Sequence, residues 1–328
     1  MNTIKWTTYN KLVIIIFFGY LFIVGYKVYL ADPYWLWTNK PGWHDEFKGG
    51  NRVLDKKQRF TKLLQVVVQQ PDIVILGSSR IYRGVDTETL NKMYPKKIYN
   101  MGISSLKITE MEAFVKHIVK WTKTKKIIIG LEFHTFRGDI LTLPGFEYNT
   151  GSLSVVIDSF FAAIFSKMAF KDAKSVYKNS EQWKDGKWNF SGYKDTIDRE
   201  SHVIEKIFKD SERSYKGITV PDEHYKKLVK IIELATNEDV EITFFLTPMT
   251  KRQLSALKKS GALNQFKEWQ KRIKHQLYKQ EVIYFDLIND HPFVKEDLSN
   301  GSSREWIDYH HFKPVVGSWI LSKFFISL

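Results

Sequence analysis

Short apolar runs that alternate with amphipathic stretches are the feature that most constrains the fold of this chain. The runs lack polar alternation, which is typical of strands buried on both faces of a sheet. They are Ile73–Leu76, Ile98–Met101, Lys126–Leu131, Val240–Leu246 and Val282–Leu287. Segments with helical spacing lie between them, and strand–helix alternation favours parallel strands. The sequence therefore predicts a doubly wound, three-layer α/β domain with about five mostly parallel strands.

One interval breaks this alternation. Residues from about 135 to 221 are too many for a simple crossover and are dense in aromatic residues and glycine. We expect a partly helical insertion or cap over one end of the sheet. The predicted division of the chain is an anchor over 1–31, a membrane-proximal link and helix over 32–70, and the α/β domain over 71–328.

The N-terminal residues predict a membrane anchor. Leu12–Ala31 is apolar, is interrupted only by Lys27, and has about the 20 residues that a spanning helix needs. Basic residues precede it and Tyr and Trp residues follow it, which favours a cytoplasmic N-terminus and a domain at the bacterial surface or in the periplasm. The alternative is a signal peptide cleaved after Ala31, although bulky Tyr29 would then occupy the −3 position.

Composition restricts the partners. The net charge is +14, but Lys and Arg are scattered and form no basic arm, finger or recognition helix, so nucleic acid is not predicted. This charge fits an anionic polymer or surface better than a base sequence, and it fits an ordinary soluble surface better still. The chain has no cysteine, which excludes disulfides and cysteine nucleophiles. No cofactor is expected.

The residues that follow each strand are the candidates for chemistry, because such sheets bind ligands beyond the carboxyl ends of their strands. Gly77-Ser78-Ser79-Arg80 follows the first strand, and a serine that leads into a helix exposes its hydroxyl near backbone N–H groups. An ordinary turn is the alternative. Asn100 and Gly102 bracket the end of the second strand, and Glu132 follows the third. Arg80 and Asn100 are candidates for binding substrate, Arg80 through an anionic glycan; the alternatives are an ordinary helix-start charge for Arg80 and a turn for Asn100.

Asp308 and His311 stand three residues apart before an apolar closing helix. A carboxylate placed in this way can fix the tautomer of the imidazole and stabilise its charged form, and a polar loop is the alternative. His310, His291 and Asp290 lie nearby and raise the question of a metal. Adjacent histidines point to opposite sides of an extended loop, and the spacing is not that of a HExxH motif. No metal site is predicted.

Taken in order, these motifs resemble the SGNH/GDSL hydrolase superfamily. The Gly-Asp-Ser block of that superfamily matches Gly77-Ser78-Ser79, and the resemblance implies Ser79 as the nucleophile. The glycine of the second block matches Gly102, which implies an oxyanion donor beside the Ser79 amide. The Asp-x-x-His block matches Asp308 and His311, which implies a Ser-His-Asp triad.

The third block departs from the pattern. It usually reads Gly-x-Asn-Asp, and its Asn donates to the oxyanion. Here the residues are Gly130-Leu131-Glu132-Phe133, with Glu132 at the position of the donor. A carboxylate cannot donate unless it is protonated, and it would repel a developing oxyanion. Either another group completes the oxyanion hole, or the activity differs from free ester hydrolysis.

The anchor and the altered block look more like one branch of the superfamily. Its members are membrane-anchored and accompany cell-envelope polymer modification, such as the D-alanine transfer protein of teichoic acids and the alginate O-acetylation accessory proteins. "WNFSGY" and "HHFKPVVGSWIL" also look similar to members of this branch, and the resemblance covers most of residues 70–328. It implies a single-pass acyl esterase or O-acyltransferase that acts on a cell-envelope or exported polysaccharide, with a membrane-bound O-acyltransferase as a partner.

Two alternatives stay open beside this enzyme. The first is a catalytically degenerate member that binds polysaccharide or scaffolds a membrane-bound acyltransferase. The second is a binder of anionic polymers or lipid surfaces that relies on the net charge of +14.

Overall fold

The structure, a computed structural model, describes residues 3–37, 50–138, 152–178, 193–194, 198–294 and 298–325. The chain forms two compact units. The first contains residues 1–68 and 152–183, and the second contains residues 69–151 and 184–328. Each unit is described by itself below.

The elements are, in chain order, α1 (Thr3–Ala31), α3 (Gly50–Lys56), α4 (Gln58–Gln69), β1 (Ile73–Gly77), α5 (Ser79–Gly84), α6 (Thr87–Met93), β2 (Ile98–Gly102), α7 (Ile108–Trp121), β3 (Lys126–Leu131), the 3-10 helix η1 (Phe133–Phe136), α8 (Leu153–Phe165), α9 (Lys167–Lys178), α10 (Ser201–Tyr215), α11 (Asp222–Thr236), β4 (Glu241–Leu246), α12 (Lys251–Lys259), α13 (Leu263–Lys279), β5 (Tyr284–Asp286) and α14 (Pro314–Phe325).

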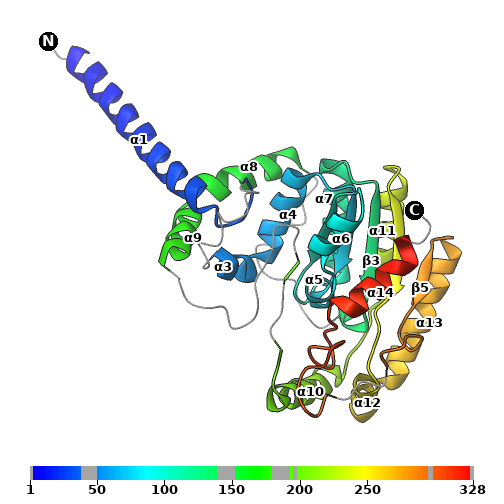
Figure 1. Cartoon of the computed structure of the whole chain (residues 1–328). Coiled ribbons are helices and arrows are strands. Elements are labelled where there is room, and N and C mark those ends of the chain that lie inside the picture. Colours follow the sequence, from blue (N-terminus) through cyan, green and yellow to red (C-terminus); the bar gives the residue numbers. More distant parts are fainter. Residues whose placement is uncertain are drawn as a thin grey trace. The chain divides into compact units, whose positions relative to one another are not determined.

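The second unit is built on a five-stranded sheet in the order β2-β1-β3-β4-β5 (Figure 1). All its strand pairs are parallel. In register, Gly77 at the end of β1 pairs with Gly102 at the end of β2, so the residues after both strands leave the sheet at the same edge. The predicted parallel sheet is confirmed, and each strand falls within its predicted run or extends it by one residue.

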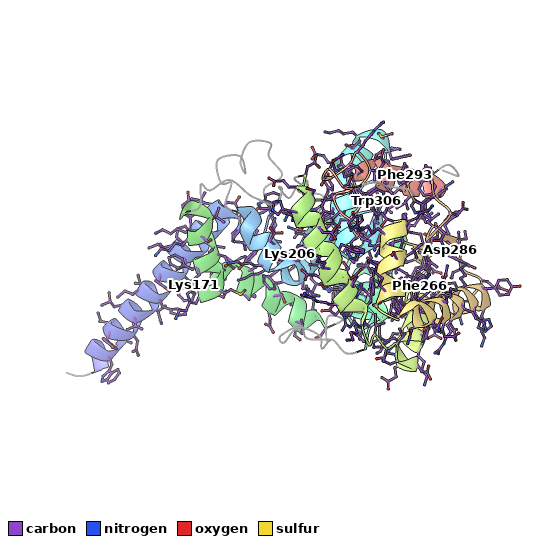
Figure 2. The ribbon with its side chains drawn as sticks, turned by 90° about the horizontal axis from the view of Figure 1, so that it is seen from below. Lys171, Lys206, Phe266, Asp286, Phe293 and Trp306 are labelled. Carbon is purple, nitrogen blue, oxygen red and sulfur yellow. The ribbon has the colours of Figure 1, made fainter. Side chains whose placement is uncertain are left out.

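Helices cover both faces of this sheet. Successive side chains of a strand point to opposite faces of its sheet. The neighbouring residues Phe244 and Phe245 of β4 are both fully buried, so both faces of the sheet are covered there. On one side, Phe324 of α14 contacts Phe245 and Phe285, and α14 also contacts α5. On the other side, α7 packs against α11, which contacts β4. Buried Phe266 and Trp306 belong to this unit and are labelled in Figure 2.

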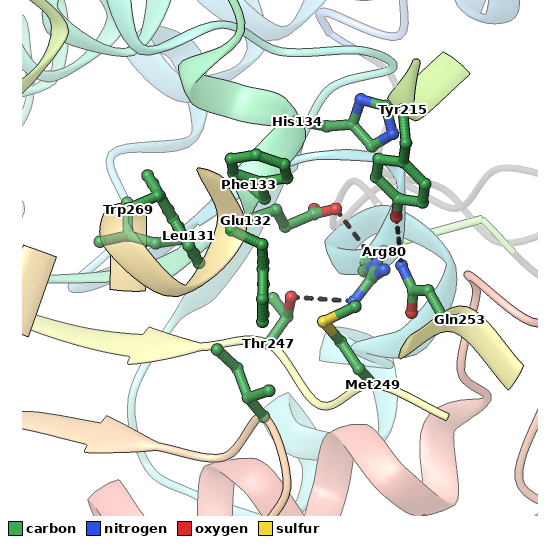
Figure 3. A pocket seen from close by; sticks show the side chains of 12 residues that line it. Arg80, Leu131, Glu132, Phe133, His134, Tyr215, Thr247, Met249, Gln253 and Trp269 are labelled. Carbon is green, nitrogen blue, oxygen red and sulfur yellow. Dashed lines mark hydrogen bonds and ion pairs between the residues drawn. The ribbon is translucent and has the colours of Figure 1, made fainter. Parts of the chain in front are cut away.

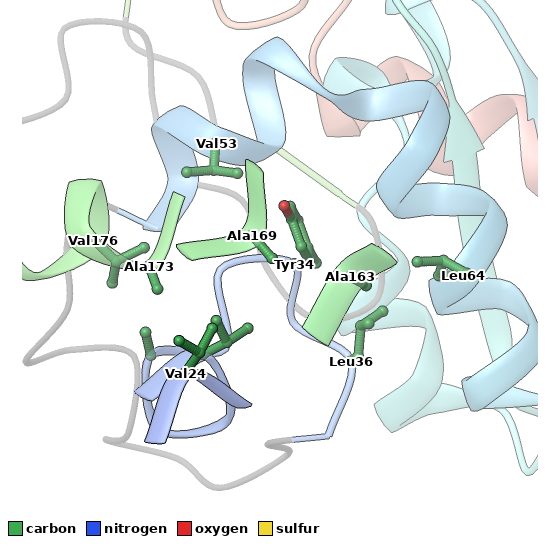
Figure 4. Packing of buried hydrophobic residues seen from close by; sticks show 11 residues of the cluster. Val24, Tyr34, Leu36, Val53, Leu64, Ala163, Ala169, Ala173 and Val176 are labelled. Carbon is green, nitrogen blue, oxygen red and sulfur yellow. The ribbon is translucent and has the colours of Figure 1, made fainter. Parts of the chain in front are cut away.

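The first unit has its own apolar core. It joins α1, the turn after it and α3 to α8 and α9 (Figure 4). Its members are Val24, Val28, Ala31, Tyr34, Leu36, Val53, Leu64, Ala163, Ala169, Ala173 and Val176. Asp32 ends α1 by accepting the N–H of Leu36 at 2.8 Å. The apolar segment Trp6–Ala31 has a mean hydropathy of 2.1 and is long enough to span a membrane or to serve as a signal sequence.

The two units divide the chain differently from the expected boundaries. The expected insertion over 135–221 is split between them: α8 and α9 belong to the first unit, whereas α10 belongs to the second. The apolar faces of α8 and α9 pack on α1 and α3, which explains the split.

Candidate active site

Ser79 lies at the carboxyl edge of the sheet, where β1 turns into α5. Ser78 is the N-cap of α5, and its hydroxyl accepts the N–H of Arg80 at 3.1 Å. Gly77 is required for this turn because a Cβ there would lie 2.4 Å from Cγ1 of Ile81. Ser79 is consequently the first helical residue and is partly exposed, whereas Ser78 and Arg80 are buried.

A tight loop before α14 carries the imidazole and the carboxylate. Trp306 and Phe312 form an antiparallel bridge and are both fully buried, so they close the loop on the core. The N–H of Ile307 donates to the carbonyl of His311 at 2.8 Å. This loop brings Asp308 and His311 to Ser79.

The three residues form a continuous chain of hydrogen bonds. Ser79 Oγ lies 2.9 Å from His311 Nε2, and His311 Nδ1 lies 2.9 and 3.0 Å from the two carboxylate oxygens of Asp308. An ionised carboxylate only accepts, so His311 carries its proton on Nδ1 when neutral. Nε2 is then the acceptor for the Ser79 hydroxyl.

Asp308 is fully buried and well supplied with donors. Its Oδ1 accepts the N–H groups of His310 and His311 at 2.8 and 2.9 Å, and its Oδ2 lies 2.6 Å from Nη1 of Arg199. Burial alone would raise the pKa of Asp308, but the His311 and Arg199 side chains outweigh it and hold that pKa well below its usual range. The group is a carboxylate at neutral pH.

His310 turns away from this chain of hydrogen bonds, as expected for adjacent histidines. Its Nδ1 accepts from the Gln253 amide at 3.0 Å, and its Nε2 meets the Ser211 hydroxyl. Burial and the nearby Arg80 guanidinium hold the pKa of His310 well below its usual value. His310 is a neutral, structural neighbour of His311.

Arg80 and Glu132 form a buried ion pair beside Ser79. Nε of Arg80 lies 3.1 Å from Oε2 of Glu132, and Nη1 of Arg80 donates to Thr247 Oγ1 and to the Pro248 carbonyl, both at 2.9 Å. The Ser78 hydroxyl donates to the other oxygen of Glu132. These contacts hold both side chains in place, and Glu132 accepts hydrogen bonds, as an ionised carboxylate does.

Asn100 and Gly102 also have a structural role instead of the expected one. Asn100 is fully buried, and its amide donates to the carbonyls of Ile81 and Val85 at 2.9 and 2.7 Å. Its oxygen accepts the N–H of Gly102 at 2.9 Å. Asn100 is therefore not a substrate ligand, and the Gly102 amide is already engaged. A Cβ at Gly102 would lie 2.2 Å from the Tyr82 nitrogen, so this glycine permits β2 to approach α5.

A small pocket adjoins the Arg80–Glu132 pair (Figure 3). Leu131, Phe133 and Trp269 form an apolar part of its lining, and Tyr215 and Gln253 are among its polar residues. Gln253 donates to the Tyr215 hydroxyl at 3.0 Å, and burial raises the pKa of Tyr215 to about 12. The pocket lining does not include Ser79 or His311.

Arg199 is the site residue that the sequence does not reveal. It lies in the long interval between the third and fourth strands and belongs to no motif. Its backbone N–H donates to Ser302 Oγ at 2.7 Å, which ties it to the loop that carries Asp308. Its tertiary contacts with Ser302 and Asp308, and not the local sequence, connect it with the site.

Within the described residues, no group of three or more His, Asp or Glu side chains is placed to hold a metal ion.

Comparisons with known proteins find similarity in solved structures. No family model and no curated protein matches the chain. One solved structure is described as a platelet activating factor from Streptococcus pneumonia; it is 13% identical, has a TM-score of 0.42, and the match covers 82% of this chain and 90% of that one. Another is a lipolytic protein of the G-D-S-L family from Desulfitobacterium hafniense, 10% identical, with a TM-score of 0.35 and coverage of 76% and 96%.

Proposed function

We propose that this chain is a membrane-anchored, extracytoplasmic acyl esterase or O-acyltransferase that acts through an acyl-enzyme on Ser79. The observation that carries the proposal is the hydrogen-bonded series from Ser79 Oγ to His311 Nε2 at 2.9 Å and from His311 Nδ1 to the buried Asp308 carboxylate. A serine, a base and an orienting carboxylate in this order are the parts of a nucleophilic triad.

The reaction follows from these contacts. His311 Nε2 takes the proton of the Ser79 hydroxyl as Oγ attacks the acyl carbonyl, and Asp308 stabilises the imidazolium that forms. The tetrahedral intermediate collapses when the bond to the leaving alcohol breaks, and that alcohol receives the proton from His311. Water as the second nucleophile then gives hydrolysis, and a glycan hydroxyl gives transfer to that glycan.

The oxyanion hole has fewer available donors than the family resemblance implies. Glu132 is paired with Arg80, and the Gly102 amide donates to Asn100. Within the described residues, the Ser79 amide has no hydrogen-bond acceptor and can donate to the oxyanion. One such donor is worth about 3 kcal/mol of transition-state stabilisation, so we expect slow turnover of simple esters unless the acyl donor or a partner supplies a second group.

The expected substrate is a cell-envelope or exported polysaccharide. A candidate membrane-spanning helix at the N-terminus and a net charge of +14 suit an enzyme that works on an anionic polymer beside the membrane. A membrane-bound O-acyltransferase is the proposed partner, because an anchored transferase needs an acyl donor on the same surface.

The test uses the full chain in detergent or vesicles with a serine-reactive fluorophosphonate probe and an aryl acetate. We expect labelling and turnover in the wild type and in Ser78→Ala, and their loss in Ser79→Ala and His311→Ala. Ser78 is the matched control because it is the neighbouring serine and its hydroxyl caps α5. Labelling that survives in Ser79→Ala would reject Ser79 as the nucleophile.

A second candidate function is a catalytically degenerate protein that binds polysaccharide or scaffolds a membrane-bound acyltransferase. The observation that favours it is the engagement of Glu132 and Gly102 in structural contacts, which removes two expected contributors to the oxyanion hole. A folded wild type that neither labels nor turns over, but is retained on an immobilised anionic polysaccharide, would favour this function.

A further inference from the structure

The first unit leaves an apolar stripe of α8 exposed. Leu153, Ile157, Phe161 and Phe165 are 56%, 44%, 60% and 40% exposed, and their four-residue spacing places them along one side of the helix. Val156 and Ala163 are the residues that α8 buries. Contiguous large apolar side chains of this kind mark an interaction surface rather than a surface kept in water.

The end of this stripe touches α1. A Cβ at Gly25 of α1 would lie 2.7 Å from Cε1 of Phe165 and 3.5 Å from Cγ2 of Ile164, so the last turn of α8 packs directly on α1. Gly25 lies near the C-terminal end of the apolar run, two residues before Lys27. When α1 spans a bilayer, this contact holds the end of α8 at the boundary between hydrocarbon and headgroups.

The next helix adds positive charge beside the stripe. Lys167, Lys171 and Lys174 are exposed, and their spacing places them on one face of α9; Lys171 is labelled in Figure 2. Ala169 and Ala173 on the other side of α9 are buried in the core of this unit (Figure 4).

A groove lies between α9 and the C-terminal end of α1. It is lined by Tyr26, Lys27, Leu30, Phe170, Ala173 and Lys174. The apolar members of this lining suit an acyl chain, and the two ammonium groups suit a phosphate. Anionic phospholipid combines both chemistries.

We propose that the α8 stripe lies in the membrane interface beside α1, in the leaflet next to the C-terminal end of α1, and that the α9 lysines bind the headgroups of anionic phospholipids there. This inference rests on the membrane anchor of the proposed function. A helix with an apolar side, beside a basic face, is the arrangement by which amphipathic elements lie in a bilayer interface. It gives the first unit a second membrane contact besides α1.

Charges on α9 argue for an interfacial position rather than a second span. The bend between α8 and α9 is 50°, and α9 carries Asp172 together with its lysines. Asp172 accepts from the Tyr34 hydroxyl at 2.6 Å and from Lys57, so it belongs to the folded unit. A charged residue is costly at the centre of a bilayer, which disfavours a path of α9 through the hydrocarbon.

The chain has no cysteine, so single-cysteine variants of the full chain can each carry one environment-sensitive fluorophore. Phe161→Cys reports on the stripe, and Tyr278→Cys on α13, 78% exposed, is the control in the second unit. Both are reconstituted in phosphatidylcholine vesicles with a minority of phosphatidylglycerol and with nitroxide-labelled lipid. We expect a blue-shifted emission and nitroxide quenching for Phe161→Cys, stronger with the nitroxide near the headgroup than deep in the chain.

The outcomes separate this inference from the anchor on which it rests. Ile16→Cys in α1, 62% exposed, reports on the span itself. Quenching of Ile16→Cys without quenching of Phe161→Cys would overturn the α8 inference and leave the anchor intact. Quenching of neither would overturn both, and stronger quenching of Phe161→Cys by the deep nitroxide would replace the interfacial position with a span.

The lysines are tested by reversing their charge. Each basic residue near an anionic surface strengthens attachment by roughly fivefold, so Lys167→Glu/Lys171→Glu/Lys174→Glu should weaken the quenching of the Phe161 label in anionic vesicles and leave it unchanged in pure phosphatidylcholine. Lys206→Glu/Lys209→Glu/Lys216→Glu is the control, because these lysines are equally exposed but lie in the second unit. Equal quenching in the two triple variants would reject headgroup binding by α9.

Discussion

The guanidinium of Arg199 lies 2.6 Å from Oδ2 of Asp308, the same carboxylate oxygen that lies 2.9 Å from Nδ1 of His311. Asp308 is therefore shared between a permanent cation and a base that becomes a cation during the proposed reaction. Because Asp308 is fully buried, both interactions act with little screening by solvent. Arg199 is consequently a positioning residue that also helps to keep Asp308 ionised.

Arg199→Gln should change the pH dependence of the reaction. Arg199 is one of the groups that hold the pKa of Asp308 below its usual range. With this counter-charge gone, the pKa of Asp308 rises, the carboxylate is protonated at a higher pH, and the acid limb of kcat/KM moves to higher pH. The variant should also lose stability of about 2 kcal/mol, because a hydrogen bond to a buried charge is removed. The pH profile of aryl acetate turnover and thermal unfolding of the full chain measure the two effects.

Exposed Arg304 supplies the control for this prediction. It lies on the loop that precedes Asp308, so Arg304→Gln removes the same charge without touching the carboxylate. Arg199→Lys should return the acid limb of the kcat/KM profile part of the way to its wild-type pH, because it restores a positive charge at this position. A profile of Arg199→Gln that matches that of Arg304→Gln would contradict the role given to Arg199.

Asp308→Asn should lower kcat by roughly a thousandfold or more, since an amide favours the wrong tautomer of His311. It should also change the dependence of stability on pH. The folded-state pKa of Asp308 is held below its usual range, so the carboxylate stabilises the fold above the ordinary pKa of about 4 and loses this effect as the pH falls below it.

The thermal unfolding temperatures of wild type and Asp308→Asn should therefore differ most near neutral pH and converge in acid. Asp210→Asn, at an exposed position on α10, controls for the loss of one negative charge. A difference between wild type and Asp308→Asn that stays constant down to acid pH would mean that the Asp308 carboxylate does not stabilise the fold.

The sheet was predictable because its signal is local. Runs such as Lys126–Leu131 are apolar without alternation, which is what burial on both faces demands. Parallel topology then requires the residues after β1 to share an edge with those after the neighbouring strands, so Gly77-Ser78-Ser79-Arg80 could be named as a candidate from its position. The choice of Ser79 over Ser78 came from the family resemblance. The loop with Asp308 and His311 was found through their spacing and their place before the closing helix.

The remaining features depend on tertiary contacts that no local pattern encodes. Arg199 reaches Asp308 across more than one hundred residues of sequence (|i−j| = 109). Asn100 looked like a polar residue at a strand end, but its partners are the carbonyls of α5. The pairing of α8 with α1 follows from a small residue at Gly25 and an aromatic ring at Phe165, two features that are unremarkable in the sequence.

Asn100→Ala should destabilise the protein rather than weaken substrate binding. Asn100 is fully buried and makes three hydrogen bonds, and the carbonyls of α5 that it satisfies would be left without it. Loss of these bonds should cost about 3 kcal/mol. Thermal unfolding should show this loss, while KM for an aryl acetate measured below the transition should stay near the wild-type value.

Asn264→Ala is the control, at an exposed position on α13, and should unfold within a degree or two of the wild type. An increase in KM for Asn100→Ala without a loss of stability would return Asn100 to its expected role as a substrate ligand. The two readouts therefore separate a structural asparagine from a binding one.

Arg80 and Glu132 should behave as one unit in a double-mutant cycle. Their side chains are 4% and 11% exposed, so removing either leaves the other charge poorly solvated, and each single variant, Arg80→Met or Glu132→Gln, should lose stability. The double variant should lose less than the sum of the two, with a coupling energy of about 1–3 kcal/mol. Thermal unfolding of the four proteins gives this coupling.

The exposed pair of Lys92 and Glu88 on α6 supplies the matched cycle. Its side chains are 74% and 56% exposed and lie 3.3 Å apart, and an exposed pair one turn apart on a helix couples by only about 0.5 kcal/mol. Additive losses of stability in the Arg80 and Glu132 variants would mean that the ion pair does not hold Arg80, the residue next to Ser79, in place. Glu132 would then be free to act on substrate, and its position in the third block would again require a functional explanation.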